Sequence, residues 1–385
     1  MLAHPDLIRR LAEARENTDE LFQLVHPDAL YERPIPERHR ILFYLGHLEA
    51  FDWNLIARYA LDRPAFHTEF DRLFAFGIDP PPGQLPSDQP SDWPRPAEVE
   101  EYNRRVRGEL DRLVDQVPEQ YLHVAIEHRL MHAETFAYIL HHLDYGHKSK
   151  VEEPAPRTAA MPSPRMVDIP AGTARLGRTP AEGFGWDNEF VAHEAEVPGF
   201  AIGRYKVTNG EYLEFVREGA APPFFWVERG GEWYYRGMFS EIPLPLDWPV
   251  YTTFREAEAY ARWRGKSIPT EPQFHRASCA APVSRNVDFR RWDPAPVTAD
   301  EGAWQGPQQL TGNGWEWTST PFAPFPGFTP FPFYRNYSEP FFDGQHHVLK
   351  GASPRTAACF LRPSFRNWFR VAYPYIYATF RLADS

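Results

Sequence analysis

The chain has 385 residues, of which 43% are hydrophobic and 15% aromatic, enough for two domains with packed cores. A net charge of −11 disfavours a nucleic-acid-binding protein, and no apolar run is long enough to span a membrane. Two cysteines cannot form a disulfide framework and the N-terminus lacks a secretory signal pattern, so we expect a reduced, cytoplasmic protein.

Apolar periodicity predicts four helices in the first 150 residues, which would pack together as a bundle. Their expected ranges are 5–25, 37–62, 97–117 and 120–144. The stretch between the second and third helices, residues 63–96, is rich in proline and is predicted to be a loop. Long loops in compact domains are often functional, so we expect this one to take part in ligand binding.

Three histidines in two of these helices form a candidate metal site. His128 and His132 are four residues apart, which places both imidazoles on one face of a helix. His47 lies in the second predicted helix and can supply a third nitrogen from a neighbouring helix. Three neutral nitrogens with open positions suit Fe(II) or Zn(II) chemistry better than a closed structural site. A chain with 15 histidines also contains such pairs by chance, so the spacing alone leaves a surface or core role open.

The second half of the chain has a different character, with short strands between glycine, proline and asparagine turns. It follows a linker predicted at residues 151–165. Strands are expected at 167–172 and 200–205, and helices with threonine caps at 209–218 and 254–263. We therefore predict an α+β multidomain protein, with a helical bundle at residues 1–150 and a second domain at residues 166–385.

Five motifs in this second half, in order, resemble those of the formylglycine-generating-enzyme (sulfatase-modifying factor) fold. They are Lys206–Val216, Ser267–Phe274, Gly312–Thr318, Val348–Ser353 and Thr379–Ala383. The resemblance implies a C-type-lectin-like domain with little regular structure. The copper chemistry of formylglycine-generating enzymes needs two closely placed cysteines in the C-terminal segment. Only Cys359 occurs there, so that activity is not expected.

The combination of the two halves is more informative than either one. A DinB-like bundle carrying the histidine pattern, followed by this second domain, resembles the ergothioneine-type nonheme iron sulfoxide synthases over almost the whole chain. Two further segments, Gly185–Glu189 and Arg362–Trp368, are similar to marks of that family. The resemblance implies that His47, His128 and His132 bind Fe(II), and that the substrates are hercynine (Nα-trimethylhistidine), O2 and a thiol or selenol.

The same resemblance points to residues that would bind substrate or donate a proton. An aromatic wall suits the trimethylammonium group of hercynine through cation–π attraction. The candidate substrate-binding residues are Trp315, Phe365, Arg366, Asn367, Trp368, Phe369 and Met131, the last between the two helix histidines. A tyrosine of the second domain is the proton donor in some members, and Tyr334 or Tyr337 lies in the matching stretch. Burial in the core is the alternative role for Trp315, for Met131 and for each tyrosine.

Departures from the family pattern bear on the co-substrate. In the branch that uses γ-glutamylcysteine, an aspartate follows the Arg-Asn-Trp triplet and arginines occupy the loop after the second helix. Here Phe369 stands in place of that aspartate, and residues 76–90 contain no arginine. Cysteine-using members carry adjacent tyrosines in this loop, and residues 76–90 contain no tyrosine either. A carboxylate usually needs such a cation, so we expect a neutral selenosugar or thiosugar, as in the selenoneine synthase branch. The candidates for binding its hydroxyls are Asp79, Gln84, Ser87, Asp88 and Gln89, unless these merely solvate a surface loop.

Two other functions remain open. The first is ergothioneine or ovothiol sulfoxide synthesis from cysteine or γ-glutamylcysteine, by the same iron chemistry. The second is a non-catalytic, lectin-like ligand-binding protein in which the bundle is only a structural partner. Metal analysis separates the second from the enzymes, because a binder need hold no iron.

Overall fold

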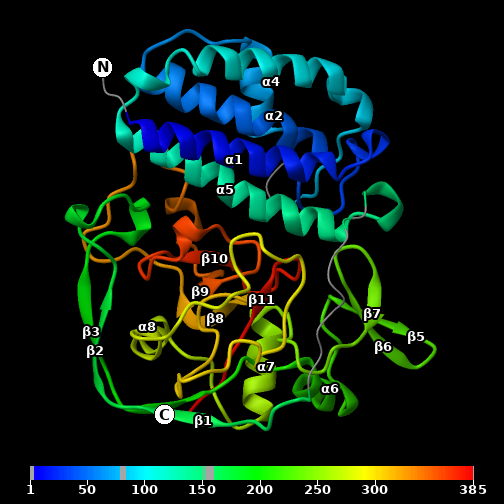
Figure 1. Ribbon diagram of the computed structural model, residues 1–385, viewed down its shortest axis with the longest axis vertical. Helices are drawn as coiled ribbons and strands as arrows, with labels where there is room; N and C mark the ends of the chain where they lie inside the picture. Colours follow the sequence, from blue (N-terminus) through cyan, green and yellow to red (C-terminus); the bar gives the residue numbers. More distant parts are fainter. Residues whose placement is uncertain (1–3, 79–83, 150, 152–159, 385) are drawn as a thin grey trace. The chain divides into compact units, whose positions relative to one another are not determined.

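A computed structural model describes residues 4–78, 84–149, 151 and 160–384. The chain forms two compact units, Met1–Val151 and Glu152–Ser385 (Figure 1). Residues 152–159 of the predicted linker lie outside the described residues. Within the described part of the chain, no helix is long and apolar enough to cross a membrane.

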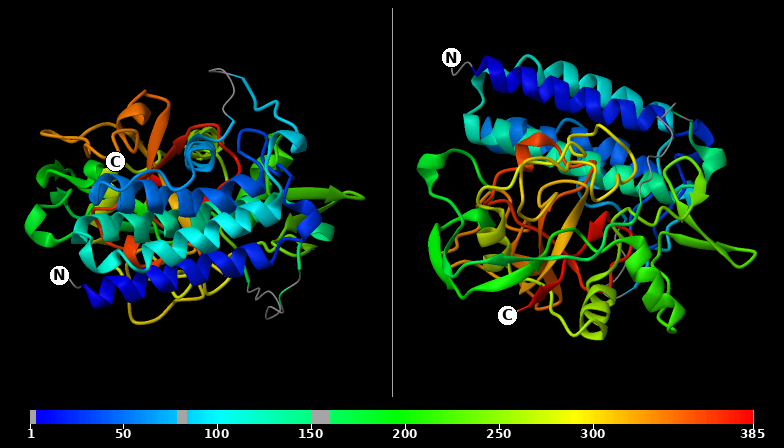
Figure 2. Two further views of the ribbon diagram at one scale, coloured as in Figure 1. Left: turned by 90° about the horizontal axis from the view of Figure 1, so that it is seen from above. Right: turned by 60° about the horizontal axis from the view of Figure 1, so that its bottom comes forward.

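The first unit is a bundle of helices that lie side by side (Figures 1 and 2). Its α-helices are α1 (Pro5–Gln23), α2 (Ile41–Asp52), α3 (Thr68–Phe76), α4 (Pro96–Leu110) and α5 (Glu119–His142), and a π-helical segment, η2 (Trp53–Ala60), directly follows α2. Short 3-10 turns are η1 (Pro27–Ala29), η3 (Pro90–Asp92), η4 (Val114–Gln116) and η5 (Tyr145–His147). Helix α1 packs along α5, and α2 packs against α3, α4 and α5. The four predicted helices are present, although the second is α-helical only from Ile41 to Asp52.

Helix α3 lies in the stretch predicted to be a loop, so that prediction is wrong for residues 68–76. An added Cβ at Gly46 would lie 2.5 Å from the ring of Phe74, so glycine at this position allows α3 to lie directly against α2. Phe74 is fully buried in this contact. The apolar spacing of Phe70, Leu73 and Phe74 was a usable helix signal among the surrounding prolines.

The second unit is built on small sheets rather than one large one. Its strands are β1 (Met166–Ile169), β2 (Gly172–Leu176), β3 (His193–Val197), β4 (Phe200–Gly203), β5 (Trp226–Arg229), β6 (Glu232–Arg236), β7 (Glu241–Pro243), β8 (Gly314–Pro321), β9 (His346–Ala352), β10 (Asn367–Arg370), β11 (Ala378–Thr379) and β12 (Ala383–Asp384). The sheet orders are β1-β4-β12, β10-β9-β8-β11, β2-β3 and β5-β6-β7. Only the β8–β11 pair is parallel among these described strands.

Three helices and four 3-10 turns complete the unit, and this α+β architecture confirms the predicted fold class. They are α6 (Asn209–Arg217), α7 (Phe254–Trp263), α8 (Glu271–Ser278), η6 (Pro180–Glu182), η7 (Asp187–Glu189), η8 (Glu339–Phe341) and η9 (Ala358–Phe360). Thr208 and Thr253 cap α6 and α7 as predicted, each within a capping box. Helix α8 was not predicted, although Thr270 and Gln273 form the same box.

Buried ion pairs join the sequence motifs of this unit to one another. Glu316 of β8 accepts hydrogen bonds from Lys206 Nζ (2.7 Å) and from Arg381 Nε and Nη2 (3.0 and 2.8 Å), and these three residues are at most 1% exposed. They belong to three of the five recognised motifs. Glu189, at the end of η7, similarly accepts from Arg362 and from the Ser364 hydroxyl, so the two segments Gly185–Glu189 and Arg362–Trp368 are in direct contact.

Candidate metal centre

The three histidines of the bundle come together from two helices. His47 is on α2, while His128 and His132 lie one turn apart on α5. One nitrogen from each residue lies within 4.8 Å of the other two. His47 Nε2 and His132 Nε2 are 3.2 Å apart, and the rings of His128 and His132 are 4.5 Å apart at their centroids. One nitrogen of each of the three imidazoles therefore points to a common place.

The orientation of His47 is fixed by the backbone of α3. Its Nδ1 lies 2.6 Å from the carbonyl oxygen of Phe74. A carbonyl oxygen only accepts hydrogen bonds, so Nδ1 carries the proton and Nε2 keeps its lone pair. The close approach of α3 to α2 at Gly46 makes this contact possible. This contact of His47 with the backbone was not predicted from the sequence, because α3 itself was not predicted.

Aromatic rings pack against two of the three imidazoles. His128 stacks on Phe51 with ring centroids 3.4 Å apart and planes 9° apart, and His47 stacks on Phe43 at 4.8 Å. One face of each of these two imidazoles is therefore covered by an aromatic ring. Burial lowers the pKa of His47 to about 4, and it lowers the pKa of His128 and of His132 as well. All three imidazoles are neutral at physiological pH, which is the form that binds metals.

This donor set fits a divalent transition-metal ion. Two imidazole nitrogens bound about 2.1 Å from one ion in adjacent positions lie about 3.0–3.4 Å apart, and the His47–His132 separation is 3.2 Å. Three neutral nitrogens from one side leave the remaining positions to substrates. Met131, half-buried, follows His128 by three residues on α5 and lies next to His132 in the chain. The arrangement can hold Fe(II) with open positions.

The loop after α3 approaches His47 indirectly, through Trp93 and Phe43. The Trp93 ring lies 6.2 Å from that of Phe43, which stacks on His47. Trp93 Nε1 donates a 2.6 Å hydrogen bond to the carboxylate of Asp88. The same carboxylate pairs with Arg33 and with Arg40, whose Nε is 2.9 Å away.

These contacts correct the sequence analysis of the loop in two respects. Asp88 is buried and engaged by Arg33, Arg40 and Trp93, so it is not available to bind a sugar hydroxyl. Residues 84–90 contain no arginine, but two arginines from the segment before α2 nevertheless reach them. Gln84, Ser87 and Gln89 are exposed. Asp79 lies outside the described residues.

The second unit brings three of its predicted site residues together. The Tyr337 ring lies 5.2 Å from Trp368 and 5.6 Å from Tyr334. Trp368 also stacks on Phe322, with ring centroids 4.3 Å apart and planes 5° apart. Burial, and secondly the charge of Asp187, raise the pKa of Tyr334 to about 12. Tyr334 therefore keeps its proton at neutral pH.

Other predicted residues are separated from that cluster. Trp368 and Phe369 are neighbours on β10, so their side chains point to opposite faces of the sheet. Phe369 stacks instead on Tyr373, and Asn367 accepts a hydrogen bond from the Trp368 backbone. The expectation that both aromatic residues line one wall is wrong.

Three further candidates lie mainly inside the second unit. Arg366 is 1% exposed, pairs with Glu271 of α8 and donates to the carbonyl of Ala323. Trp315 is also buried, 6.0 Å from the ring of Phe365. These contacts agree with the core role that the sequence analysis left open for Trp315, and they give Arg366 a structural role in holding α8.

Known proteins resemble this chain in both units. Residues 10–145 match the DinB superfamily, and residues 150–385 match the sulfatase-modifying factor enzyme 1-like domain. A hercynine oxygenase of Mycolicibacterium smegmatis is 33% identical over 100% of this chain and 99% of its own length. Ergothioneine biosynthesis protein 1 of Schizosaccharomyces pombe is 28% identical over 94% of this chain, which spans about half (54%) of that protein. A formylglycine-generating enzyme of Streptomyces coelicolor is 26% identical over 45% of this chain and 77% of its own length.

Proposed function

Because the chain belongs to the hercynine oxygenase family, we propose that it is an iron-dependent oxygenase that forms a C–S or C–Se bond on the imidazole of hercynine. The observation that carries this proposal is the group of three neutral imidazoles from α2 and α5. It is the donor set of an open metal site, and it occurs in a chain that is similar to a hercynine oxygenase over its full length.

The proposed reaction has a defined balance of atoms and electrons. With a thiol, hercynine loses its ring C–H hydrogen and the thiol loses its S–H hydrogen as the C–S bond forms. One oxygen atom of O2 becomes the sulfoxide oxygen, and the other leaves as water with the two hydrogens. His47, His128 and His132 would hold the Fe(II), which would supply the O2 activation that this four-electron oxidation needs. The protein fixes the imidazole nitrogens, excludes water around them and supplies a proton, for which we propose Tyr334 or Tyr337.

A direct experiment tests the reaction class. The purified chain is loaded anaerobically with Fe(II), given hercynine and a panel of thiols and selenols, and then exposed to O2. Mass spectrometry should detect a hercynine adduct that requires Fe(II), O2 and both substrates. Absence of any adduct across the panel, with iron bound, would favour the non-catalytic binding protein instead.

We expect Trp368 to contribute to recognition of the trimethylammonium group. A cation over an aromatic face gains about 0.5–2 kcal/mol, which corresponds to about 2–30-fold in affinity. Calorimetry should therefore show hercynine binding more tightly than histidine, which lacks the quaternary cation. Trp368→Leu should reduce this preference by a similar factor.

Phe369→Leu is the matched control for that substitution, because Phe369 is the next residue on β10 and faces the other way. It should leave the preference for hercynine unchanged. Equal affinities of the unaltered protein for hercynine and histidine would contradict the role of the aromatic cluster.

For the second substrate we propose a neutral selenosugar or thiosugar. The exposed polar side chains of residues 84–90 are two amides and a hydroxyl, from Gln84, Ser87 and Gln89, which can replace the hydration of sugar hydroxyls. Arg33 and Arg40, two arginines that reach this loop, are already paired with Asp88. An amino-acid carboxylate buried beside them would compete with Asp88 for these cations or lose its hydration without one, at a cost of several kcal/mol.

Competition between co-substrates checks this proposal. Hercynine, O2, cysteine, γ-glutamylcysteine and 1-selenoglucose are combined with the Fe(II) protein in one reaction. We expect the selenosugar adduct to dominate, also because a selenol is anionic at neutral pH. A predominance of the cysteine or γ-glutamylcysteine sulfoxide would instead identify ergothioneine or ovothiol synthesis.

A further inference from the structure

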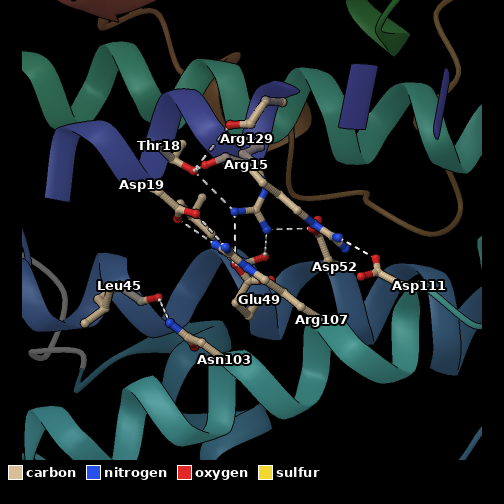
Figure 3. Close-up of polar contacts among 12 residues, drawn as sticks. Arg15, Thr18, Asp19, Leu45, Glu49, Asp52, Asn103, Arg107, Asp111 and Arg129 are labelled. Carbon is tan, nitrogen blue, oxygen red and sulfur yellow. Dashed lines mark hydrogen bonds and ion pairs between the residues drawn. The ribbon is translucent and has the colours of Figure 1, made fainter. Parts of the chain in front are cut away.

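A buried network of charged residues crosses the bundle (Figure 3). At its centre is Arg129 of α5, which immediately follows His128 and has no exposed surface. Its Nη1 donates to Glu49 Oε1 (3.0 Å), and its Nη2 donates to Asp52 Oδ2 (2.6 Å) and to the carbonyl oxygen of Leu48 (3.2 Å). All three acceptors are on α2, which also carries His47.

The network continues to the other two long helices. Arg107 of α4 donates from Nε to Glu49 Oε1 (2.8 Å), and its two terminal nitrogens pair with the carboxylate of Asp19 on α1 at 2.6 and 2.7 Å. Glu49 is therefore shared between Arg107 and Arg129, as Figure 3 shows. Glu49 and Asp52 are at most 1% exposed, so neither carboxylate can exchange these partners for water.

Stability alone is a weak explanation for such a network. Burying charges costs hydration, and replacing a buried ion pair with apolar residues is often neutral or stabilising. The best-attested use of buried polar groups is to fix one register between elements. Here three acceptors spread over residues 48–52 of α2 meet one planar guanidinium, which restrains both the rotation and the translation of α2 against α5.

We propose that Arg129 is a positioning residue for the metal centre, holding α2 and α5 in the register that brings His47 to His128 and His132. This inference rests on the proposed metal site and extends it to a residue that touches no metal. Sites of this kind need their ligands held to within about 0.5 Å, which a helix that slides or turns cannot provide. Arg129 is the next residue after His128, and Leu48 is the next residue after His47. The hydrogen bonds of Arg129 to α2 therefore restrain each helix one residue away from a histidine.

The test compares Arg129→Lys with Arg381→Lys. Arg381 also has no exposed surface and pairs with the buried carboxylate of Glu316 at 2.8 Å, but it belongs to the second unit and lies on no helix that carries a ligand. Co(II) is the probe. Chelator competition measures its affinity, and visible absorption reports its coordination geometry. Thermal unfolding of the metal-free protein measures the stability of each variant. Second-layer groups around metals typically change affinity 10–100-fold, so we expect a loss of about 10-fold or more and an altered Co(II) spectrum for Arg129→Lys only.

Equal Co(II) affinity and spectrum for the two variants would overturn the positioning role, even if both unfold at lower temperature. Should Arg129→Lys not fold, it is replaced by the combination Glu49→Gln, Asp52→Asn and Arg129→Met, in which all three side chains are uncharged. Co(II) binding by this variant with unaltered affinity and spectrum would equally overturn the inference. If the unaltered protein binds no Co(II), both the proposed metal centre and the positioning role of Arg129 are wrong. This outcome is distinguishable from failure of the positioning role alone, because it is seen without any Arg129 variant.

Discussion

Replacing His128 with alanine should abolish iron binding and turnover while leaving the bundle folded. The substitution removes one of three imidazole nitrogens that lie within 4.8 Å of one another. Loss of groups that only support a ligand costs about 10–100-fold in affinity, so loss of a ligand itself should cost at least about 100-fold. Iron content per chain after anaerobic loading and desalting measures the effect, and thermal unfolding checks that the helices remain cooperative.

His123→Ala is the control on the same helix. His123 lies five residues before His128, close to Glu119, and is not part of the group of converging nitrogens. This variant should bind as much iron as the unaltered protein. Stoichiometric iron in the His128→Ala protein would show that the three histidines are not the ligands, and the proposed function would lose the observation that carries it.

The second unit should unfold far more readily when Glu316 is replaced by glutamine. Glu316 is 1% exposed and is the acceptor for both Lys206 and Arg381, which are themselves buried. Glutamine keeps the shape but leaves two buried cations without their counter-charge. Breaking a buried pair from one side costs about 3–5 kcal/mol, a large share of the stability of a domain. Urea unfolding followed by tryptophan fluorescence measures the loss.

Glu258→Gln provides the comparison, because it removes an ion pair of the same unit that is exposed. Glu258 pairs with Arg262 one turn along α7, and the two side chains are 48% and 71% exposed. Exposed pairs contribute little, so this variant should unfold at the same urea concentration as the unaltered protein. Equal effects of the two substitutions would mean that the Lys206–Glu316–Arg381 contacts do not hold the motifs together.

Local patterns in the sequence determined several features of the fold and of the candidate site. Each depends on residues only a few positions apart: the four-residue spacing of His128 and His132, the threonine caps of α6 and α7, and the motif around Glu316. Such patterns act through one helical turn or one strand, and they hold whatever else surrounds them. They were enough to predict the fold class, helices α6 and α7 of the second unit and the metal-ligand candidates.

Tertiary structure decided what surrounds those residues. Arg129 and Asp52 are separated by 77 positions, and Arg40 and Asp88 by 48, so no local pattern reveals that they pair. Burial without water obliges each charge to find a partner wherever the fold provides one. The Phe74 carbonyl that orients His47 likewise depends on how closely α3 packs on Gly46. The sequence by itself therefore determined which side chains can bind a metal, and only the packing of the helices decided how they are held.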